Sequence, residues 1–191
     1  MAAPDSEVHR LAGRIRALVL DVDGVLTDAG LYYGPHGEVM KRFSARDGFG
    51  IVVARHAGLA VAVLSGRVSP PLRSRLRDLG VPPDRVIQGS TNKADDIDRL
   101  AAVLGLPLDE MAFMGDDVPD LPALLRVGLA ACPADAAPEV VQAAHLVSRF
   151  PGGRGAVREL VETVLRAQGT WDGLAEAWRR GAPPVVGSGR Q

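Results

Sequence analysis

The stretch LVLDVDGVLTD, residues 18–28, decides how the rest of the chain is interpreted. It begins as a continuous apolar run, which is typical of a strand buried on both faces of a parallel sheet. It ends in two closely spaced aspartates, Asp21 and Asp23, followed by Gly24. Ionised carboxylates repel one another and aspartate is a poor strand former, so this crowding needs a compensating charge. We therefore expect a divalent cation here, together with a phosphoryl group that is transferred.

Short apolar runs and helix-like segments alternate along the chain. The expected strands cover residues 15–22, 59–66, 85–89, 110–117, 127–132 and 145–148. The expected helices cover residues 46–58, 69–80, 92–105, 120–128, 137–144 and 155–169. This alternation predicts an α/β fold with a doubly wound, mostly parallel, Rossmann-like sheet and helices on both faces.

One segment breaks the alternation. In GLYYGPHGEVMKRF, residues 30–43, two short runs flank a Gly-Pro-His-Gly turn, which predicts a small β-hairpin insertion. We expect one main domain over residues 14–169, preceded by an N-terminal extension at 1–13. The C-terminal tail, residues 170–191, contains both tryptophans at helical spacing and predicts a short helix.

The bulk composition excludes several classes of protein. The chain has 191 residues, 47% of them hydrophobic, which suits one sizeable core. Its net charge of -1 indicates neither a nucleic-acid-binding nor a membrane-binding protein. The N-terminal residues contain no long apolar stretch, so we expect no signal peptide or membrane anchor. Cys132 is the only cysteine, which favours a cytoplasmic location.

Polar residues follow the expected strands at their carboxyl ends, where open parallel sheets bind ligands. They are Asp21 and Asp23 after the first strand, Ser65, Gly66 and Arg67 after the second, Asp116, Asp117 and Asp120 after the fourth, and Lys93 at a helix start. Mg²⁺ prefers hard oxygen ligands, and Asp21 and Asp116 can supply them from neighbouring strands.

These residue types suit phosphoryl transfer. Asp21, at a strand tip, is a candidate nucleophile that would form an aspartyl-phosphate. Asp23 is placed to protonate the leaving alcohol and later to activate water. Ser65 would hold phosphoryl oxygens, and Lys93 would oppose the negative charge of the transition state. Taken singly, each motif also fits a turn, a helix cap or a surface lysine, so the prediction depends on their joint order.

Four motifs resemble those of the haloacid dehalogenase superfamily of phosphatases: DVDGVLTD (21–28), LSGR (64–67), Lys93 and GDDVPD (115–120). Longer segments resemble the small phosphatases that act on 3-deoxy-D-manno-octulosonate 8-phosphate. These segments are residues 20–51, 88–100 and 150–160, within a similarity that runs from about residue 14 to about 169.

The resemblance implies roles for particular residues. Asp21 would be both the nucleophile and a magnesium ligand. Asp23 would be the general acid and base, and would bind the metal through its backbone carbonyl. Asp116 would complete the protein ligands, supported by Asp117 and Asp120.

The resemblance also implies that Ser65 and Lys93 hold the phosphoryl group, and that the protein is a homotetramer whose hairpins meet in a central barrel. The sequence offers a reason for assembly, because only the hairpin lies where other members carry a cap domain. The site would be open in a monomer, and a neighbouring subunit could supply its wall. The alternative is a hairpin that closes over its own site.

An acidic sugar phosphate also presents a carboxylate, which arginine binds in a bidentate manner. The candidates are Arg46, Arg67, Arg75 and Arg154. Arg67 is favoured because it follows Ser65, whereas Arg46 could instead take part in a helix cap and Arg75 is expected in solvent. Arg154 precedes a helix start, and the resemblance suggests that it reaches a neighbour's pocket.

The motifs therefore predict a magnesium-dependent phosphatase, and the resemblance implies that its substrate is 3-deoxy-D-manno-octulosonate 8-phosphate and that it serves lipopolysaccharide precursor synthesis. A related acidic sugar, such as a nonulosonate 9-phosphate, stays open as the substrate. Two other classes are disfavoured. A non-catalytic oligomerisation module would not need all of the acidic residues, and a dehalogenase would have little use for Asp23.

Overall fold

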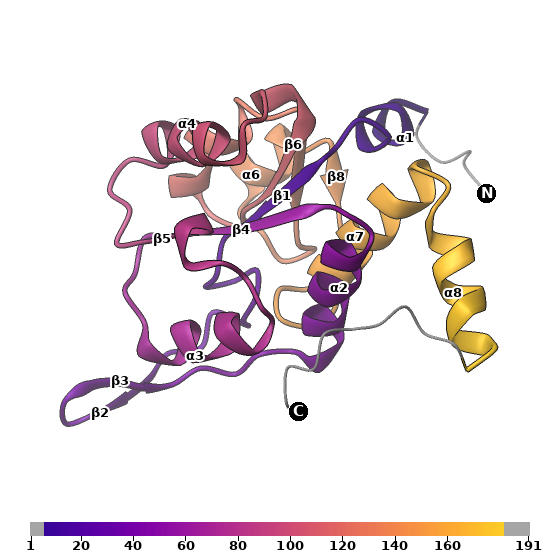
Figure 1. Ribbon diagram of the computed structural model, residues 1–191. Helices are drawn as coiled ribbons and strands as arrows, with labels where there is room; N and C mark the ends of the chain where they lie inside the picture. Colours follow the sequence, from indigo (N-terminus) through magenta and orange to yellow (C-terminus); the bar gives the residue numbers. More distant parts are fainter. Residues whose placement is uncertain (1–5, 182–191) are drawn as a thin grey trace.

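The structure is a computed structural model and describes residues 6–181 (Figure 1). Residues 1–5 and 182–191, which belong to the expected N-terminal extension and C-terminal tail, lie outside it. Within the described chain, no helix combines the length and the apolar character needed to cross a bilayer.

A six-stranded parallel sheet forms the centre of the molecule, in the order β5-β4-β1-β6-β7-β8. The strands are β1 (Ala17–Leu20), β4 (Ala60–Ser65), β5 (Val86–Gln88), β6 (Met111–Met114), β7 (Leu129–Cys132) and β8 (Leu146–Val147). Each lies inside the run expected for it and is shorter. The predicted α/β class and the parallel sheet are confirmed.

Helices cover both faces of this sheet (Figure 1). They are α1 (Ser6–Ala12), α2 (Ala45–His56), α3 (Pro70–Asp78), α4 (Lys93–Leu104), α5 (Leu121–Leu124), α6 (Pro138–Ala143), α7 (Ala156–Ala167) and α8 (Trp171–Arg179). Single 3₁₀ turns lie at Pro83–Arg85, Leu108–Glu110 and Val118–Asp120. Helix α1 was not expected from the sequence, whereas α8 is the short helix predicted in the tail.

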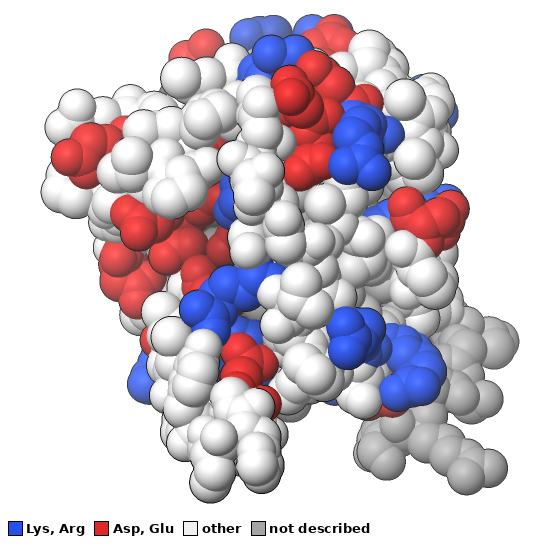
Figure 2. All heavy atoms as spheres, turned by 90° about the vertical axis from the view of Figure 1, so that its left-hand side faces the viewer, with Lys and Arg blue, Asp and Glu red and all other residues white. Residues whose placement is uncertain are grey.

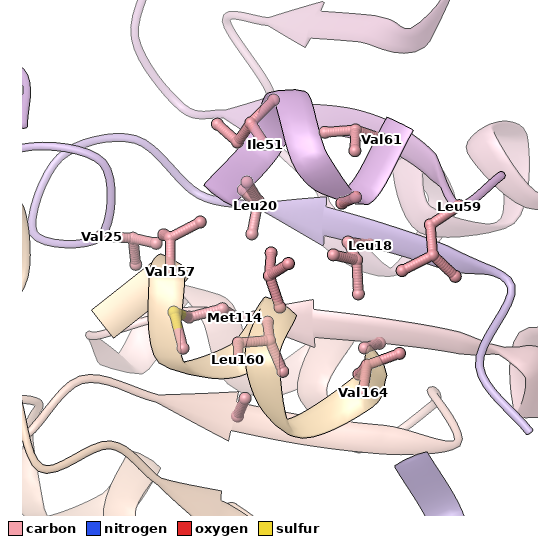
Figure 3. Close-up of a cluster of buried hydrophobic side chains, with 14 of the residues drawn as sticks. Leu18, Leu20, Val25, Ile51, Leu59, Val61, Met114, Val157, Leu160 and Val164 are labelled. Atoms are coloured by element: carbon pink, nitrogen blue, oxygen red, sulfur yellow. The ribbon is translucent and has the colours of Figure 1, made fainter. Parts of the chain in front are cut away.

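Alternating side chains of β1 enter two separate hydrophobic cores. Leu18 and Leu20 pack with α2 and α7 on one face, as Figure 3 shows. Val19 faces the other core, which α4, α5 and α6 complete. Leu160 of α7 is fully buried in the first core, and truncating a leucine in such a place to alanine typically costs about 2–5 kcal/mol. This two-sided burial makes the strand tips a rigid mounting for the residues that follow them.

The hairpin consists of β2 (Tyr32–Gly34) and β3 (Gly37–Met40), which pair with each other and with no other described strand. It extends away from the main sheet beside α3 (Figure 1). Its apolar side chains face solvent in the isolated chain: Tyr33 and Val39 are each 61% exposed and Met40 is 52% exposed. Exposed apolar side chains gathered on one small element in this way are unusual in a monomeric protein.

Helix caps fix the positions of Lys93 and Ser69. The Asn92 side chain accepts hydrogen bonds from the backbone N–H groups of Ala94 and Asp95, so α4 begins at Lys93. The Ser69 side chain accepts a hydrogen bond from the Leu72 N–H and begins α3 in the same way.

Candidate active site

The carboxyl ends of β1, β4 and β6 meet at a pocket of about 380 Å³. Its walls contain Asp21, Asp23, Ala29, Ser65, Gly66, Arg67, Ser90, Thr91, Lys93, Asp116, Asp117, Pro119 and Asp120. The side of the molecule that carries the hairpin shows acidic side chains gathered beside basic ones (Figure 2). The structure thus brings together nine of the site residues that the sequence indicates, because the ends of neighbouring parallel strands share one edge of the sheet.

Three carboxylates form the centre of the pocket, and we call Asp21, Asp116 and Asp120 the carboxylate cluster. One oxygen from each lies within 4.8 Å of the others. The Lys93 ammonium donates a 2.8 Å hydrogen bond to Asp21 Oδ1 and another to Asp120. Asp120 also accepts from the backbone N–H groups of Asp116 at 2.9 Å and Asp117 at 3.2 Å. Asp120 is therefore occupied in holding the turn and Lys93.

The cluster carries more negative charge than its surroundings balance. Burial, followed by repulsion from Asp120, raises the pKa of Asp21 to about 7 even though Lys93 opposes the shift. Burial, followed by repulsion from Asp21, raises the pKa of Asp116 to about 8. Burial disfavours charge on Lys93, but Asp21 and Asp120 outweigh that effect and raise the pKa of Lys93. With every group ionised, three carboxylates and one ammonium leave two negative charges.

That charge and that donor set fit one divalent cation with hard oxygen ligands. Asp21 and Asp116 are the members of the cluster with oxygens to spare, since Asp120 is held by Lys93 and two backbone N–H groups. The chain makes room for Asp116 with Gly24, whose φ is +90°. A Cβ atom at position 24 would lie 2.0 Å from Asp116 Oδ2, so only glycine allows this close approach.

Asp23 lies outside the carboxylate cluster and faces the hairpin. Its Oδ1 atom accepts a hydrogen bond from Lys41, which directly follows β3. The Arg67 Nε atom is 3.7 Å from Asp23 Oδ2. Lys41 is a site residue that the sequence analysis missed, because nothing in a lysine 18 positions from Asp23 signals that the hairpin returns to the pocket.

Two loops beside the cluster provide small polar groups. Ser65, at the tip of β4, is buried, and its Oγ accepts a 3.2 Å hydrogen bond from the Arg67 backbone N–H. The Ser65 carbonyl accepts from the Ser90 N–H at 3.0 Å, which joins the loop after β4 to the loop after β5. Within residues 6–181, the buried Ser90 hydroxyl has no hydrogen-bond partner. Ser90 and Thr91 were also missed, and their place just before Lys93 was the available signal.

Arg46 and Arg154 do not line the acidic pocket of their own chain. Arg46 lines a separate pocket of about 270 Å³ beside Arg149 and Arg158. Arg154 is exposed at the end of a loop that packs behind the aspartates. Arg75, expected in solvent, is half-buried, and a Cβ atom at Gly48 would meet its guanidinium.

The loop before α7 supports the pocket from behind. The Gly153 N–H donates to the Val25 carbonyl at 2.8 Å, and a Cβ atom at Gly152 would lie 1.7 Å from the Gly24 carbonyl oxygen. The buried Asp47 carboxylate accepts from the Gly155 N–H at 3.0 Å and the Arg158 N–H at 2.9 Å. Gly152 and Gly153 are therefore explained by close contact with the loop that follows Asp23, whereas Gly155 is explained by its φ of +123°.

A parallel sheet with carboxylates at the tips of its central strands, a lysine at a helix start and a hairpin insertion defines a class of hydrolase. The family model for haloacid dehalogenase-like hydrolases matches residues 84–159. A curated relative, 3-deoxy-D-manno-octulosonate 8-phosphate phosphatase of Escherichia coli K12, is 40% identical over 87% of this chain and 88% of its own.

Solved structures agree with this comparison. The cobalt-bound deoxy-D-mannose-octulosonate 8-phosphate phosphatase of Haemophilus influenzae matches with a TM-score of 0.81 and 41% identity, covering 83% of this chain and 92% of that one. The Moraxella catarrhalis 3-deoxy-D-manno-octulosonate 8-phosphate phosphatase, in complex with magnesium, phosphate and KDO, matches with a TM-score of 0.87 and 30% identity, covering 92% and 99%. The chain belongs to the family of 3-deoxy-D-manno-octulosonate 8-phosphate phosphatases, as its sequence motifs indicate.

Proposed function

We propose that this protein is a magnesium-dependent phosphatase that hydrolyses 3-deoxy-D-manno-octulosonate 8-phosphate to the free sugar acid and phosphate. The observation that carries the proposal is the carboxylate cluster, in which Asp21 lies at the tip of β1, in the same pocket as Asp116 and within 2.8 Å of Lys93. The relative from Moraxella catarrhalis with magnesium, phosphate and KDO supports both the cofactor and the substrate.

The residues of the pocket suit a two-step reaction. An Asp21 carboxylate oxygen attacks phosphorus, the ester P–O bond breaks, and Asp23 gives a proton to the departing alkoxide oxygen. Asp23 then removes a proton from water as that water attacks the phosphorus of the aspartyl-phosphate. Phosphate leaves, and Asp21 returns to its ionised state.

Other side chains hold the groups in place. Ser65 and Lys93 are positioned to bind phosphoryl oxygens, and Lys93 also offsets the charge that develops there. Asp21 and Asp116, with the backbone carbonyl of Asp23, would hold Mg²⁺, which supplies charge neutralisation and orientation for the phosphoryl group. Asp117 and Asp120 support the turn that carries Asp116.

The sugar carboxylate requires a cationic partner. Arg67, on the wall of the pocket and 40% exposed at its side chain, is our first candidate. Arg46 and Arg154 lie away from the pocket of their own chain, so we assign them to substrate binding only through a neighbouring subunit. The exposed apolar surface of the hairpin supports assembly, and we propose a homotetramer.

We place the protein in the cytoplasm, in lipopolysaccharide precursor synthesis. This placement is supported by Cys132, a buried free thiol that a reducing compartment preserves. We also propose that residues 14–169 form the phosphatase domain, with residues 1–13 as an N-terminal extension and residues 170–191 as a C-terminal tail.

A substrate panel tests the proposed function. The purified protein, with Mg²⁺, is offered 3-deoxy-D-manno-octulosonate 8-phosphate, a nonulosonate 9-phosphate and a neutral hexose 6-phosphate, and released phosphate is measured. We expect the highest kcat/KM on the eight-carbon acid, with loss of turnover in a chelator. A preference for the nine-carbon acid would move the assignment to that sugar, and equal low rates on all three would refute it.

A further inference from the structure

A polar network joins the hairpin to Asp23. We call Tyr33, Glu38, Lys41, Arg67 and Ser69 the hairpin network. The first three belong to the hairpin or follow it directly, and the last two belong to the segment that follows β4. This network, and not hydrophobic packing, fastens the hairpin to the pocket, because the apolar side chains of β2 and β3 point into solvent.

Lys41 is the centre of the network and is almost completely buried, with 1% of its side chain exposed. It donates a hydrogen bond to Asp23 Oδ1 and lies 3.1 Å from Glu38 Oε2. A buried ammonium is costly unless it is paired, so these two carboxylates are the reason that Lys41 remains inside. Among residues 6–181, no other acidic side chain forms an ion pair with Lys41.

Glu38 is itself fixed from the other side. Its Oε1 atom accepts a 2.5 Å hydrogen bond from the Ser69 hydroxyl, and Ser69 is the N-cap of α3. The Ser69 backbone N–H donates to Gln88 Oε1 of β5 at 2.8 Å. The chain of contacts from the helix cap through Glu38 to Lys41 therefore begins on the rigid sheet and ends on the Asp23 carboxylate.

The two oxygens of Asp23 have different surroundings. Oδ1 accepts from Lys41, whereas Oδ2 accepts no hydrogen bond from any described residue, since Arg67 Nε stands 3.7 Å away. The Arg67 guanidinium instead donates a 2.5 Å hydrogen bond to the Tyr33 hydroxyl oxygen. One oxygen is thus held by the hairpin, and the other remains available to carry a proton.

We propose that Lys41, anchored by Glu38, is a positioning residue that fixes the rotamer of Asp23 so that Oδ2 delivers the proton to the leaving oxygen. The inference rests on the proposed function, in which Asp23 is the general acid. It assigns to the hairpin a part in the chemistry of its own subunit, in addition to any contact with a neighbour.

Leaving-group dependence separates this role from a structural one. An alkyl phosphate needs its departing oxygen to be protonated, whereas p-nitrophenyl phosphate releases a stable phenolate and needs little help. We expect Lys41→Met to lower kcat/KM on the sugar phosphate about 100-fold, within the range of general acid catalysis, and kcat/KM on p-nitrophenyl phosphate less than about 10-fold. We compare kcat/KM because it reports the steps up to departure of the leaving group and leaves out hydrolysis of the aspartyl-phosphate, which is common to both substrates. Lys41→Arg, which keeps a donor, should recover part of the sugar phosphate activity.

Two controls complete the experiment. Arg42→Met removes the next cation along the chain, whose partner is the partly exposed Asp28, and should leave both rates unchanged. In an Asp23→Asn background, Lys41→Met should cause no further loss on the sugar phosphate, since it acts only through Asp23. An equal loss on both substrates, or a full additional loss in the Asp23→Asn background, would overturn the proposal.

The aryl phosphate rate also reports whether Lys41→Met has folded. If that variant yields no folded protein, Lys41→Gln and Glu38→Gln are measured in the same way, and each must show the selective loss for the proposal to stand. Failure of the proposed function is seen separately, in the substrate preference of the unmodified enzyme. The ratio of alkyl to aryl rates can be measured with any sugar phosphate that the enzyme accepts.

Discussion

Gly24→Ala is the substitution that best tests the arrangement of the metal site. A Cβ atom at this position would lie 2.0 Å from Asp116 Oδ2, whereas ordinary contacts begin at 3.4 Å, so the carboxylate must retreat by about 1.4 Å. Mg²⁺ holds its oxygen ligands at about 2.0–2.1 Å in a nearly ideal octahedron, so a ligand displaced this far is lost.

The expected loss of Mg²⁺ affinity is about 100-fold, because even the loss of a partner that only orients a ligand costs about 10- to 100-fold. When Mg²⁺ is in excess, a 100-fold weaker affinity removes about 2.7 kcal/mol of ligand-induced stability. For a domain of this size that corresponds to a thermal shift on adding Mg²⁺ that is smaller by about 5–10 °C.

Gly58→Ala is the matched control. Gly58 has the same φ of +90°, but a Cβ atom there would meet nothing within 4 Å. Both variants carry the backbone strain of a left-handed alanine, about 1–2 kcal/mol, and should melt a few degrees lower without metal. Only Gly24→Ala should lose the Mg²⁺-induced shift and the activity. If the two variants respond equally to Mg²⁺, Asp116 is not a ligand.

Three further predictions follow from the same geometry. Asp21→Asn should lower kcat by roughly 10³-fold or more, since it removes the proposed nucleophile. It should also raise the Tm of the metal-free protein, because the Asp21 carboxylate is buried beside Asp120. A variant that retains turnover contradicts the proposed nucleophile. The pKa values of Asp21 and Asp116, about 7 and about 8, lie above the ordinary 3.8, so the metal-free protein should lose stability as pH rises from about 4 to about 8. Mg²⁺ binds the ionised forms, and its thermal shift should therefore be larger at pH 8 than at pH 5.5, as scanning calorimetry can measure. Replacing Tyr33, Val39 and Met40 together with serine should reduce the assembled mass seen by light scattering, and an unchanged mass would show that the hairpin is not the interface.

The central part of the fold could be predicted from the sequence because its signals are local. Each of β1, β4 and β6 lies in a largely apolar run of sequence. Asn92 marks the start of α4 through its capping side chain, and Gly105 marks its end through its positive φ. Helix α1 was missed because its position depends on tertiary packing. Ala12 is buried against the core that α7 completes, a contact that the short segment itself does not encode.

The residues of the candidate site also fall into a predictable group and an unpredictable group. Residues at strand tips and helix starts were predictable, since parallel topology brings these points together wherever the intervening helices run. Lys41 was not predictable, because its place depends on the path of a hairpin that lies outside the main sheet. Ser69 and Glu38 were missed for the same reason, since their contact joins the hairpin to the start of α3.

The distribution of charge differs between the carboxylate cluster and the hairpin network, and so do the functions that these two groups of side chains can serve. The carboxylate cluster, with Lys93, has two negative charges in excess, so it attracts a dication and, through that cation and Lys93, a phosphoryl group. On the hairpin side, Asp23 and Glu38 are balanced by the two cations of the hairpin network. That side needs no metal to be stable and can exchange a proton without disturbing the cluster. Separate balance supports the two roles that we propose for Asp21 and Asp23, a nucleophile and a proton donor only two positions apart in one pocket.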